Sequence, residues 1–178
     1  MNITDLAKNF LKNKYSKLSS QGEGGQSERA NMFLEDIIEI ARALFEVEAA
    51  SLFAINHTAE EIYALKSAGA GTEDLNKITI KFGIGIVGHT AKEKSCIISN
   101  NPEQDIRFNR GFDRKTGFKT KNILSYPIIY DTKIFAILEL INKKENFTES
   151  DKGILNEIFL EIKDIFISAI NNNSYLRQ

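Results

Sequence analysis

Apolar residues recur at helical spacing in three stretches of the chain. The first covers residues 3–18 and is followed by a Gly- and Ser-rich segment at 19–27. The second covers residues 28–46, and the third covers 149–170. A repeat of three to four residues places such side chains on one side of a helix, so the pattern predicts three amphipathic helices. In the third helix, one stripe is formed by Ile154, Ile158, Ile162, Ile165 and Ala169.

Between the second and third helices, shorter apolar or alternating runs predict strands. A short helical pattern at 86–94 lies among them, whereas residues 100–122 are polar and lack periodicity. A loop of that length inside a compact domain usually has a function. Strands joined as hairpins, with helices at both ends, predict an α+β domain with a mainly antiparallel sheet of about six strands. The strand runs are 50–55, 61–69, 78–82, 96–99, 123–130 and 134–142.

Composition narrows the class of protein. The chain has 178 residues, 42% hydrophobic and 26% charged, and its 23 Lys and Arg are balanced by 24 Asp and Glu. Such a balance gives no reason to expect nucleic acid or an anionic membrane as a partner. The apolar runs are far too short to span a membrane, and the N-terminus lacks the apolar core of a signal peptide. A single cysteine, Cys96, excludes an intramolecular disulfide, and we expect a cytoplasmic protein.

Three glycines in the stretch KFGIGIVGHT, at positions 83, 85 and 88, have the spacing of a dinucleotide-binding loop. That interpretation also requires an acidic residue at the end of the next strand, where the sequence is CIISNN. The hairpin-rich order of elements also argues against a doubly wound nucleotide-binding fold. We therefore expect Gly83 and Gly85 to shape a turn and Gly88 to allow close packing of the short helix. The start of that helix, at Ile86 and Val87, still offers unpaired N–H groups to a phosphate.

The sequence contains no strong catalytic or metal-binding motif. His57 and His89 are the only histidines, they lie far apart, and no cluster of Cys and His accompanies them. Cys96 lies in an apolar run and is more typical of a small core residue than of a nucleophile. Neither a P-loop nor a serine nucleophile elbow is present. These observations favour a non-catalytic domain, and we expect neither a metal nor a cofactor.

Two segments carry a resemblance to a known family. Residues 105–128 read DIRFNRGFDRKTGFKTKNILSYPI, and residues 139–151 read ELINKKENFTESD. Together they resemble the cyclic-nucleotide-binding GAF domains of phosphodiesterases and adenylyl cyclases, and the resemblance extends over residues 28–170. Residues 1–27 would then be an N-terminal helix and flexible linker, and residues 171–178 a C-terminal tail. The family signature falls on Asn142, Lys143, Phe147 and Asp151.

The signature departs from the family pattern at Lys152, where a glutamate is usual. By resemblance, Lys143 and Asp151 form a structural tie near the final helix rather than a ligand contact. The resemblance also implies that the terminal helices cover one face of the sheet, while a lid of loop and short helices covers the other. A cyclic nucleotide, cAMP or cGMP, is then enclosed between the sheet and the lid.

The same resemblance implies ligand contacts at particular positions. Ser51 would lie beside the base, backbone N–H groups of the short helix would hold the cyclic phosphate, and Glu139 would face the ligand. These roles are chemically reasonable, since Thr hydroxyls can donate to phosphate, aromatic rings can cover purines, and a buried carboxylate needs a partner. The complete set is Ser51, Lys66, Ser67, Ile86, Val87, Phe108, Asn109, Asp113, Thr116, Phe118, Thr120 and Glu139.

Several of these residues also have an ordinary structural interpretation. Glu139 could face solvent or pair with a lysine, as strand carboxylates usually do. Thr116 and Thr120 could be turn residues, and Phe108 and Phe118 could simply pack within the lid. On that interpretation the domain would bind no ligand.

The base preference depends on residues 66–68, where by resemblance cGMP-binding members commonly have an aromatic and an acidic residue. The chain has Lys66, Ser67 and Ala68 there. Because a guanine edge presents N–H groups that favour a carboxylate acceptor, the absence of an acid at these positions favours cAMP over cGMP.

The leading interpretation is a regulatory sensor. Helices 28–46 and 149–170 would pass the ligand signal to a homodimer partner or to a linked output domain, such as a cyclase, phosphodiesterase or kinase. The alternative is a ligand-free GAF module that serves dimerisation. The free methionine sulfoxide reductase of GAF architecture uses several cysteines, and bilin-attaching photosensors use a cysteine at another position, so Cys96 disfavours both.

Overall fold

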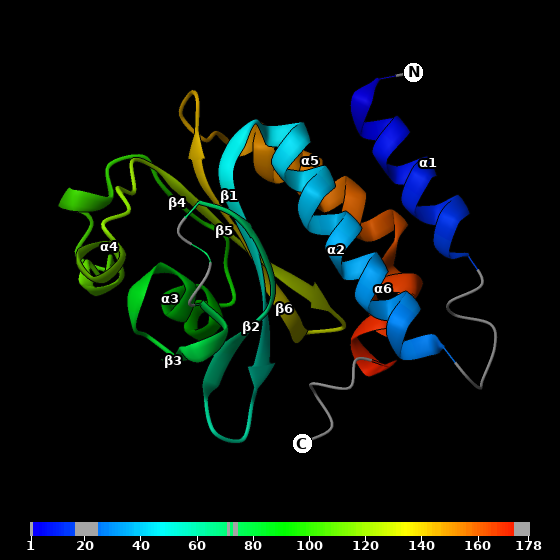
Figure 1. Cartoon of the computed structure of the whole chain (residues 1–178), viewed down its shortest axis with the longest axis horizontal. Coiled ribbons are helices and arrows are strands. Elements are labelled where there is room, and N and C mark those ends of the chain that lie inside the picture. Colours follow the sequence, from blue (N-terminus) through cyan, green and yellow to red (C-terminus); the bar gives the residue numbers. More distant parts are fainter. Residues whose placement is uncertain (1, 17–24, 71, 73–74, 173–178) are drawn as a thin grey trace.

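An antiparallel sheet separates two unlike layers of the protein (Figure 1). The structure, a computed structural model, describes residues 2–16, 25–70, 72 and 75–172. The sheet has six strands in the order β3-β2-β1-β6-β5-β4, and every neighbouring pair is antiparallel. This arrangement confirms the predicted α+β class. The strands are β1 Val47–Asn56, β2 Glu61–Gly69, β3 Thr79–Lys81, β4 Ile97–Ser99, β5 Ile123–Tyr130 and β6 Lys133–Lys143.

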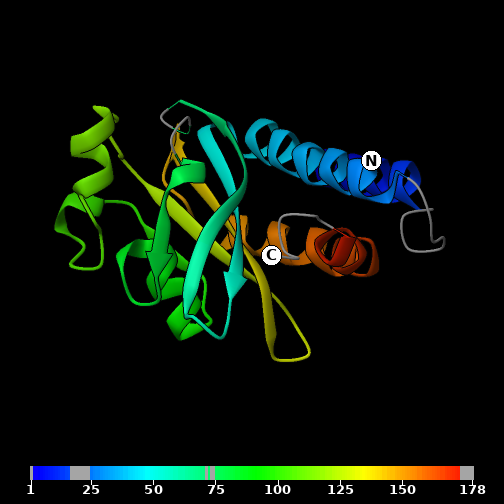
Figure 2. The same cartoon turned by 60° about the horizontal axis from the view of Figure 1, so that its bottom comes forward.

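Four helices form a layer on one face of the sheet, and the first of them packs against the other helices (Figures 1 and 2). Strand alternation directs Leu52 of β1 and Leu138 of β6 into this layer, where they join Phe33 and Phe166 in one fully buried core. Each such side chain contributes about 1.5–3 kcal/mol on burial, so this core is a main source of stability. None of the helices in the described part of the chain is long and apolar enough to cross a membrane. The four are α1 Ile3–Tyr15, α2 Gln26–Phe45, α5 Glu149–Glu161 and α6 Lys163–Asn172.

The first helix packs as part of the helical layer. Leu11 and Tyr15 of α1 are buried, and the Tyr15 ring meets Phe33 of α2 edge-on with centroids 4.9 Å apart. The Tyr15 hydroxyl donates to Asp36 of α2 at 2.6 Å. Most of the linker predicted at 19–27 lies outside the described residues, and the domain division proposed there stays a prediction.

The single helix predicted at 149–170 is interrupted, which corrects the sequence prediction. α5 and α6 are separated by Ile162, whose backbone has φ −99° and ψ 12°. The Tyr130 hydroxyl, from β5, donates to the Phe159 carbonyl of α5 at 2.8 Å. In an uninterrupted helix that carbonyl would accept from the N–H of Lys163, so this long-range contact accounts for the break.

The opposite face of the sheet is covered by a short helix and a lid. The helix α3 spans Gly85–Glu93, and the lid, which we define as residues 105–120, contains α4 Gly111–Thr116. Short 3-10 turns at Leu75–Lys77 and Pro102–Gln104 complete the layer. The predicted arrangement of helices on one face and a lid on the other is therefore confirmed (Figure 2).

The turn before α3 explains its three glycines. Gly83 and Gly85 have φ of 78° and 69°, in the left-handed region that L side chains rarely adopt. A Cβ at Gly88 would lie 2.6 Å from the Lys81 carbonyl oxygen, so α3 can approach β3 this closely only with glycine there. Both predicted roles of the glycines are confirmed.

Asn142 anchors the end of the lid to the sheet. Its side chain is buried, and its Nδ2 donates to the Glu48 carboxylate at 2.8 Å and to the Lys119 carbonyl at 2.9 Å. The backbone N–H of Lys121 donates to Asn142 Oδ1 at 2.7 Å. Asn142 has a positive φ of 61°, which asparagine tolerates better than most residues. One side chain thus joins the lid to the start of β1, directly after α2.

The remaining signature residues tie the end of β6 to α5. Lys143 Nζ lies 2.6 Å from Asp151 Oδ1, and Asp151 also accepts from the Thr148 backbone N–H at 2.7 Å to cap α5. Phe147 is buried, and its backbone N–H donates to Asn100 Oδ1 at 2.9 Å. These contacts match the structural role that the resemblance implied for Lys143 and Asp151.

Candidate ligand-binding cavity

A cavity of about 460 Å³ lies between the sheet and the lid. Its walls are β1, β6, the first turn of α3, the lid, and described residues between positions 70 and 81, including β3. This volume is within the range of about 300–1,000 Å³ typical of small-molecule sites. Much of the wall is apolar, and such a surface suits a flat aromatic ligand. The apolar wall includes Ala49, Phe53, Ile86, Phe108, Ile123 and Ile141.

Glu139 is a buried carboxyl group in this wall. It lies on β6 between Leu138 and Leu140, which face the helical layer, so strand alternation turns its side chain toward the cavity. Glu139 is 9% exposed, and its carboxyl oxygens have no hydrogen-bond partner among the described residues. Burial, and then the carboxylate of Asp113, raise the pKa of Glu139 to about 7. A buried group of this kind is poorly satisfied until a partner reaches it.

Two serines flank Glu139 across the sheet. Ser51 on β1 and Ser125 on β5 are its direct register partners, and such paired side chains point to one face with Cβ atoms about 4.5–5.5 Å apart. Both serines are buried, and the Ser125 hydroxyl has no hydrogen-bond partner within the described part of the chain. The three residues therefore form a buried polar row, Ser51–Glu139–Ser125, that reaches the cavity through Glu139.

Besides the anchor at Asn142, the lid is held by contacts of its own residues. The carboxylate of Asp113 accepts from the backbone N–H and from the hydroxyl of Thr120, both at 2.8 Å. Asn109 Oδ1 accepts from the Gly111 N–H at 2.9 Å and so begins α4. Phe108 packs against the small apolar cluster at the start of α3. Polar ties and an aromatic contact thus fix the shape of the lid over the cavity.

The first turn of α3 is the electropositive feature of the cavity. Gly85, Ile86 and Val87 line it, and the N–H groups of a first helical turn have no acceptor within the helix. Among the described residues that line the cavity, Lys81 is the one basic side chain, and its ammonium lies 2.6 Å from the Glu61 carboxylate. An anion in the cavity is therefore best placed at the helix N-terminus.

Eight of the predicted contact residues line this one cavity. They come from α3, the lid and β6, which are far apart in sequence. Thr116 is the last residue of α4, and its side chain lies outside the described part of the structure. The eight are Ile86, Val87, Phe108, Asn109, Asp113, Phe118, Thr120 and Glu139.

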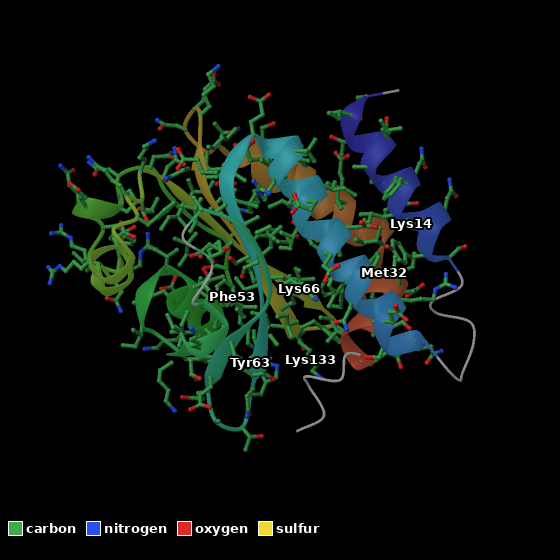
Figure 3. All side chains as sticks on the ribbon, in the orientation of Figure 1. Lys14, Met32, Phe53, Tyr63, Lys66 and Lys133 are labelled. Carbon is green, nitrogen blue, oxygen red and sulfur yellow. The ribbon has the colours of Figure 1, made fainter. Side chains whose placement is uncertain are left out.

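Three predicted residues are not in the cavity wall. Lys66 lies on the helical side of the sheet, with its ammonium 2.6 Å from Glu35 of α2, whereas Phe53 lies on the cavity side (Figure 3). Lys66 and Ser67 line a separate hollow of about 490 Å³ between β2 and α2. Ser51 is buried beside Glu139 in the polar row.

Sequence analysis missed the wall formed by residues 75–81. Leu75, Ile78 and Ile80 line the cavity from this segment, together with Lys81. The alternation in ITIKF was a usable signal, because it predicts that Ile78 and Ile80 share one face. What the pattern does not show is that this face closes a cavity rather than a core.

The sheet, its helical layer and the lidded cavity define an α+β domain built around a small-molecule-sized site. A family model described as GAF domain matches residues 30–162. The chain therefore belongs to the GAF domain family, as the sequence resemblance predicted.

Curated relatives include cyclic-nucleotide phosphodiesterases. The probable 3',5'-cyclic phosphodiesterase pde-5 of Caenorhabditis elegans is 31% identical over 133 residues, which cover 69% of this chain and 18% of that protein. The rod cGMP-specific 3',5'-cyclic phosphodiesterase subunit alpha of Bos taurus is 30% identical over 157 residues, which cover 83% and 17%. The chain thus spans less than a fifth of the length of these relatives.

Solved structures share the fold at low identity. The GAF domain of a phosphoenolpyruvate-protein phosphotransferase from Acinetobacter has a TM-score of 0.71 at 14% identity, covering 96% of this chain and 95% of that one. The free methionine-R-sulfoxide reductase of Neisseria meningitidis, solved with its substrate, has a TM-score of 0.70 at 13% identity, covering 96% and 94%. At such identities these likenesses support the fold alone.

Proposed function

We propose that this chain is a regulatory domain that binds a cyclic nucleotide, cAMP or cGMP, in the cavity beneath the lid. The proposal depends on one observation: the same cavity contains a buried carboxyl group, Glu139, with no hydrogen-bond partner in the described part of the chain, and the open N-terminus of α3. A cyclic nucleotide carries the complementary groups, which are N–H donors on its purine and a single negative charge on its phosphate. The phosphodiesterase relatives, whose names refer to cyclic nucleotides, support this ligand class.

The ligand would be oriented by the chemistry at the two ends of the cavity. The cyclic phosphate would accept from the N–H groups of Ile86 and Val87, and the base would lie toward Glu139. Phe108 or Phe118 of the lid would cover the purine face. Asp113 and Thr120 hold the lid in shape through their own hydrogen bonds, so loss of these bonds would weaken the enclosure of the ligand.

The expected preference for cAMP loses its original basis. It depended on the absence of an acid at residues 66–68, but Lys66 pairs with Glu35 on the other side of the sheet. Among the described acids that line the cavity, Asp113 is engaged by Thr120, whereas the Glu139 carboxyl group accepts no hydrogen bond from a described residue, so we assign the base preference to Glu139.

The signal would leave through the helical layer to a homodimer partner or a linked output domain. Ile3, Leu6 and Phe10 form an exposed apolar stripe along one side of α1, at 64%, 54% and 46% exposure. We propose that a second copy of the chain covers this stripe. A cytoplasmic location is proposed as well, because the single cysteine is compatible with a reducing compartment.

Isothermal titration calorimetry with cAMP and with cGMP tests the proposal. Saturable heat is expected for at least one nucleotide, with weaker binding by Thr120→Val, which loses the hydroxyl that donates to Asp113. Thr58→Val is the matched control, because Thr58 is exposed in the turn between β1 and β2. No binding of either nucleotide by folded protein, together with dimerisation in sedimentation, would instead support the ligand-free interaction module.

A further inference from the structure

We propose that Glu139 reads the purine edge in two protonation states, so that its neutral acid pairs with adenine and its carboxylate pairs with guanine. The inference rests on the proposed function and deepens it, because it makes one residue responsible for the choice between cAMP and cGMP. It also makes that choice depend on the pH around the protein.

The surroundings of Glu139 leave its carboxyl group free for a ligand. Its register partners on the neighbouring strands are Ser51 and Ser125, and both are small and uncharged. From the lid it faces Asp113, whose two oxygens are both engaged by Thr120. No hydrogen bond from any described residue reaches the Glu139 oxygens, so a base edge would meet them directly.

The charged and titratable groups near Glu139 do not fix its charge. From β3, Lys81 lines the cavity but is paired with Glu61 at 2.6 Å. From α3, Nδ1 of the His89 ring contacts the Gly85 carbonyl at 2.9 Å, and His89 lines a neighbouring hollow rather than the cavity. Among the described residues that line the cavity, Asp113 is therefore the only other carboxylate, and it opposes a second negative charge.

Both states of Glu139 are accessible close to neutral pH. Burial, and then the Asp113 carboxylate, raise its pKa to about 7. Below that pH the group is an acid with one O–H donor and one carbonyl acceptor, and above it the group has two acceptor oxygens.

The two purine edges match these two states separately. Adenine presents the N1 acceptor beside an amino donor, which fits the O–H and C=O of the neutral acid. Guanine presents N1–H beside an amino donor, which fits the two oxygens of the carboxylate. Each mismatched pairing leaves a buried donor or acceptor without a partner, which is the costly outcome in a closed site.

The sign of the pH dependence follows from these pairings. Affinity for cGMP falls as the pH drops below the pKa of Glu139, because the carboxylate must be regenerated before guanine binds. Affinity for cAMP falls as the pH rises above it, because a proton must be taken up. The affinity ratio of cGMP to cAMP is then expected to rise about tenfold per pH unit, or about 100-fold from pH ~6 to pH ~8.

Calorimetric titration of the full chain with cAMP and with cGMP at about pH 6, 7 and 8 tests this inference. Glu139→Gln should bind cAMP with little pH dependence and lose the rise in cGMP affinity, because an amide offers one donor and one acceptor at every pH. Glu157→Gln, at an exposed site on α5, is the control and should keep the wild-type profile.

The outcomes separate this inference from the proposed function. Binding of either nucleotide with a ratio that changes less than about twofold across this pH range would overturn the role of Glu139 while leaving the proposed function intact. A Glu139→Gln protein that keeps the wild-type slope would do the same. If that variant does not fold, the wild-type slope decides alone. If wild-type protein binds neither nucleotide at any of these pH values, the proposed function fails and this inference with it.

Discussion

Replacement of Asn142 by alanine should be among the most destabilising changes outside the hydrophobic core. The variant removes the acceptor for the Lys121 N–H and the donor to the Lys119 carbonyl. Each unpaired backbone group costs about 1–2 kcal/mol, and alanine at a φ of 61° adds about 1 kcal/mol. The bond to Glu48 adds less, because that carboxylate is 46% exposed and screened by water.

The expected total is a loss of about 3–5 kcal/mol from a free energy of unfolding that for most domains is about 5–15 kcal/mol. Urea unfolding followed by circular dichroism measures it. Asn142→Gly loses the same hydrogen bonds but relieves the backbone strain, so it should be about 1 kcal/mol more stable than Asn142→Ala. Asn13→Ala, exposed on α1, should change stability by less than about 0.5 kcal/mol.

Two results would refute this reasoning about Asn142. One is a loss below about 1 kcal/mol for Asn142→Ala, which would mean that water replaces the side chain without cost. The other is a glycine variant no more stable than the alanine variant, which would mean that the positive φ stores no strain.

Three further changes test other parts of the structure. Glu139→Gln should be more stable than wild type above neutral pH. Folding raises the Glu139 pKa from 4.5 to about 7, so the stability of the wild-type protein falls by up to about 3 kcal/mol as the pH rises through that window. Unfolding curves of the two proteins, measured across this pH range, should therefore diverge. Gly88→Ala should lower the free energy of unfolding by about 1–3 kcal/mol, because the new Cβ would lie 2.6 Å from the Lys81 carbonyl oxygen. Gly153→Ala, which has open space inside α5, should raise it by about 0.5–1 kcal/mol in the same denaturant assay. Tyr130→Phe should lower the free energy of unfolding by about 1 kcal/mol and speed amide hydrogen exchange around Ile162. Unchanged exchange there would show that the Tyr130 hydroxyl does not cause the break between α5 and α6.

The elements that the sequence predicted well are those whose pattern is local. Helical spacing located α1 and α2, and the interruption of an apolar strand by Glu139 indicated a buried carboxyl group. The resemblance brought together lid residues that periodicity cannot relate, since Asp113 and Thr120 meet only through the folded lid.

The elements that the sequence could not predict depend on distant contacts. The pairing of β1 with β2 shifts register between Leu52 and Phe53, next to Lys66 on β2. A one-residue shift of register reverses the face to which a side chain points, so the face of Lys66 depends on this pairing. The break at Ile162 is matched to a hydroxyl from Tyr130, which lies on β5. Neither feature leaves a trace in the local hydrophobic pattern.

The shortness of the two outer strands has a consequence for self-association. β3 and β4, which form the two edges of the sheet, are three residues long each. Such short edges offer too few free backbone groups to template another strand, which is how natural sheets avoid growing into fibres. Association with the proposed partner would therefore use side chains on the faces of the protein, without the risk of open-ended strand polymerisation.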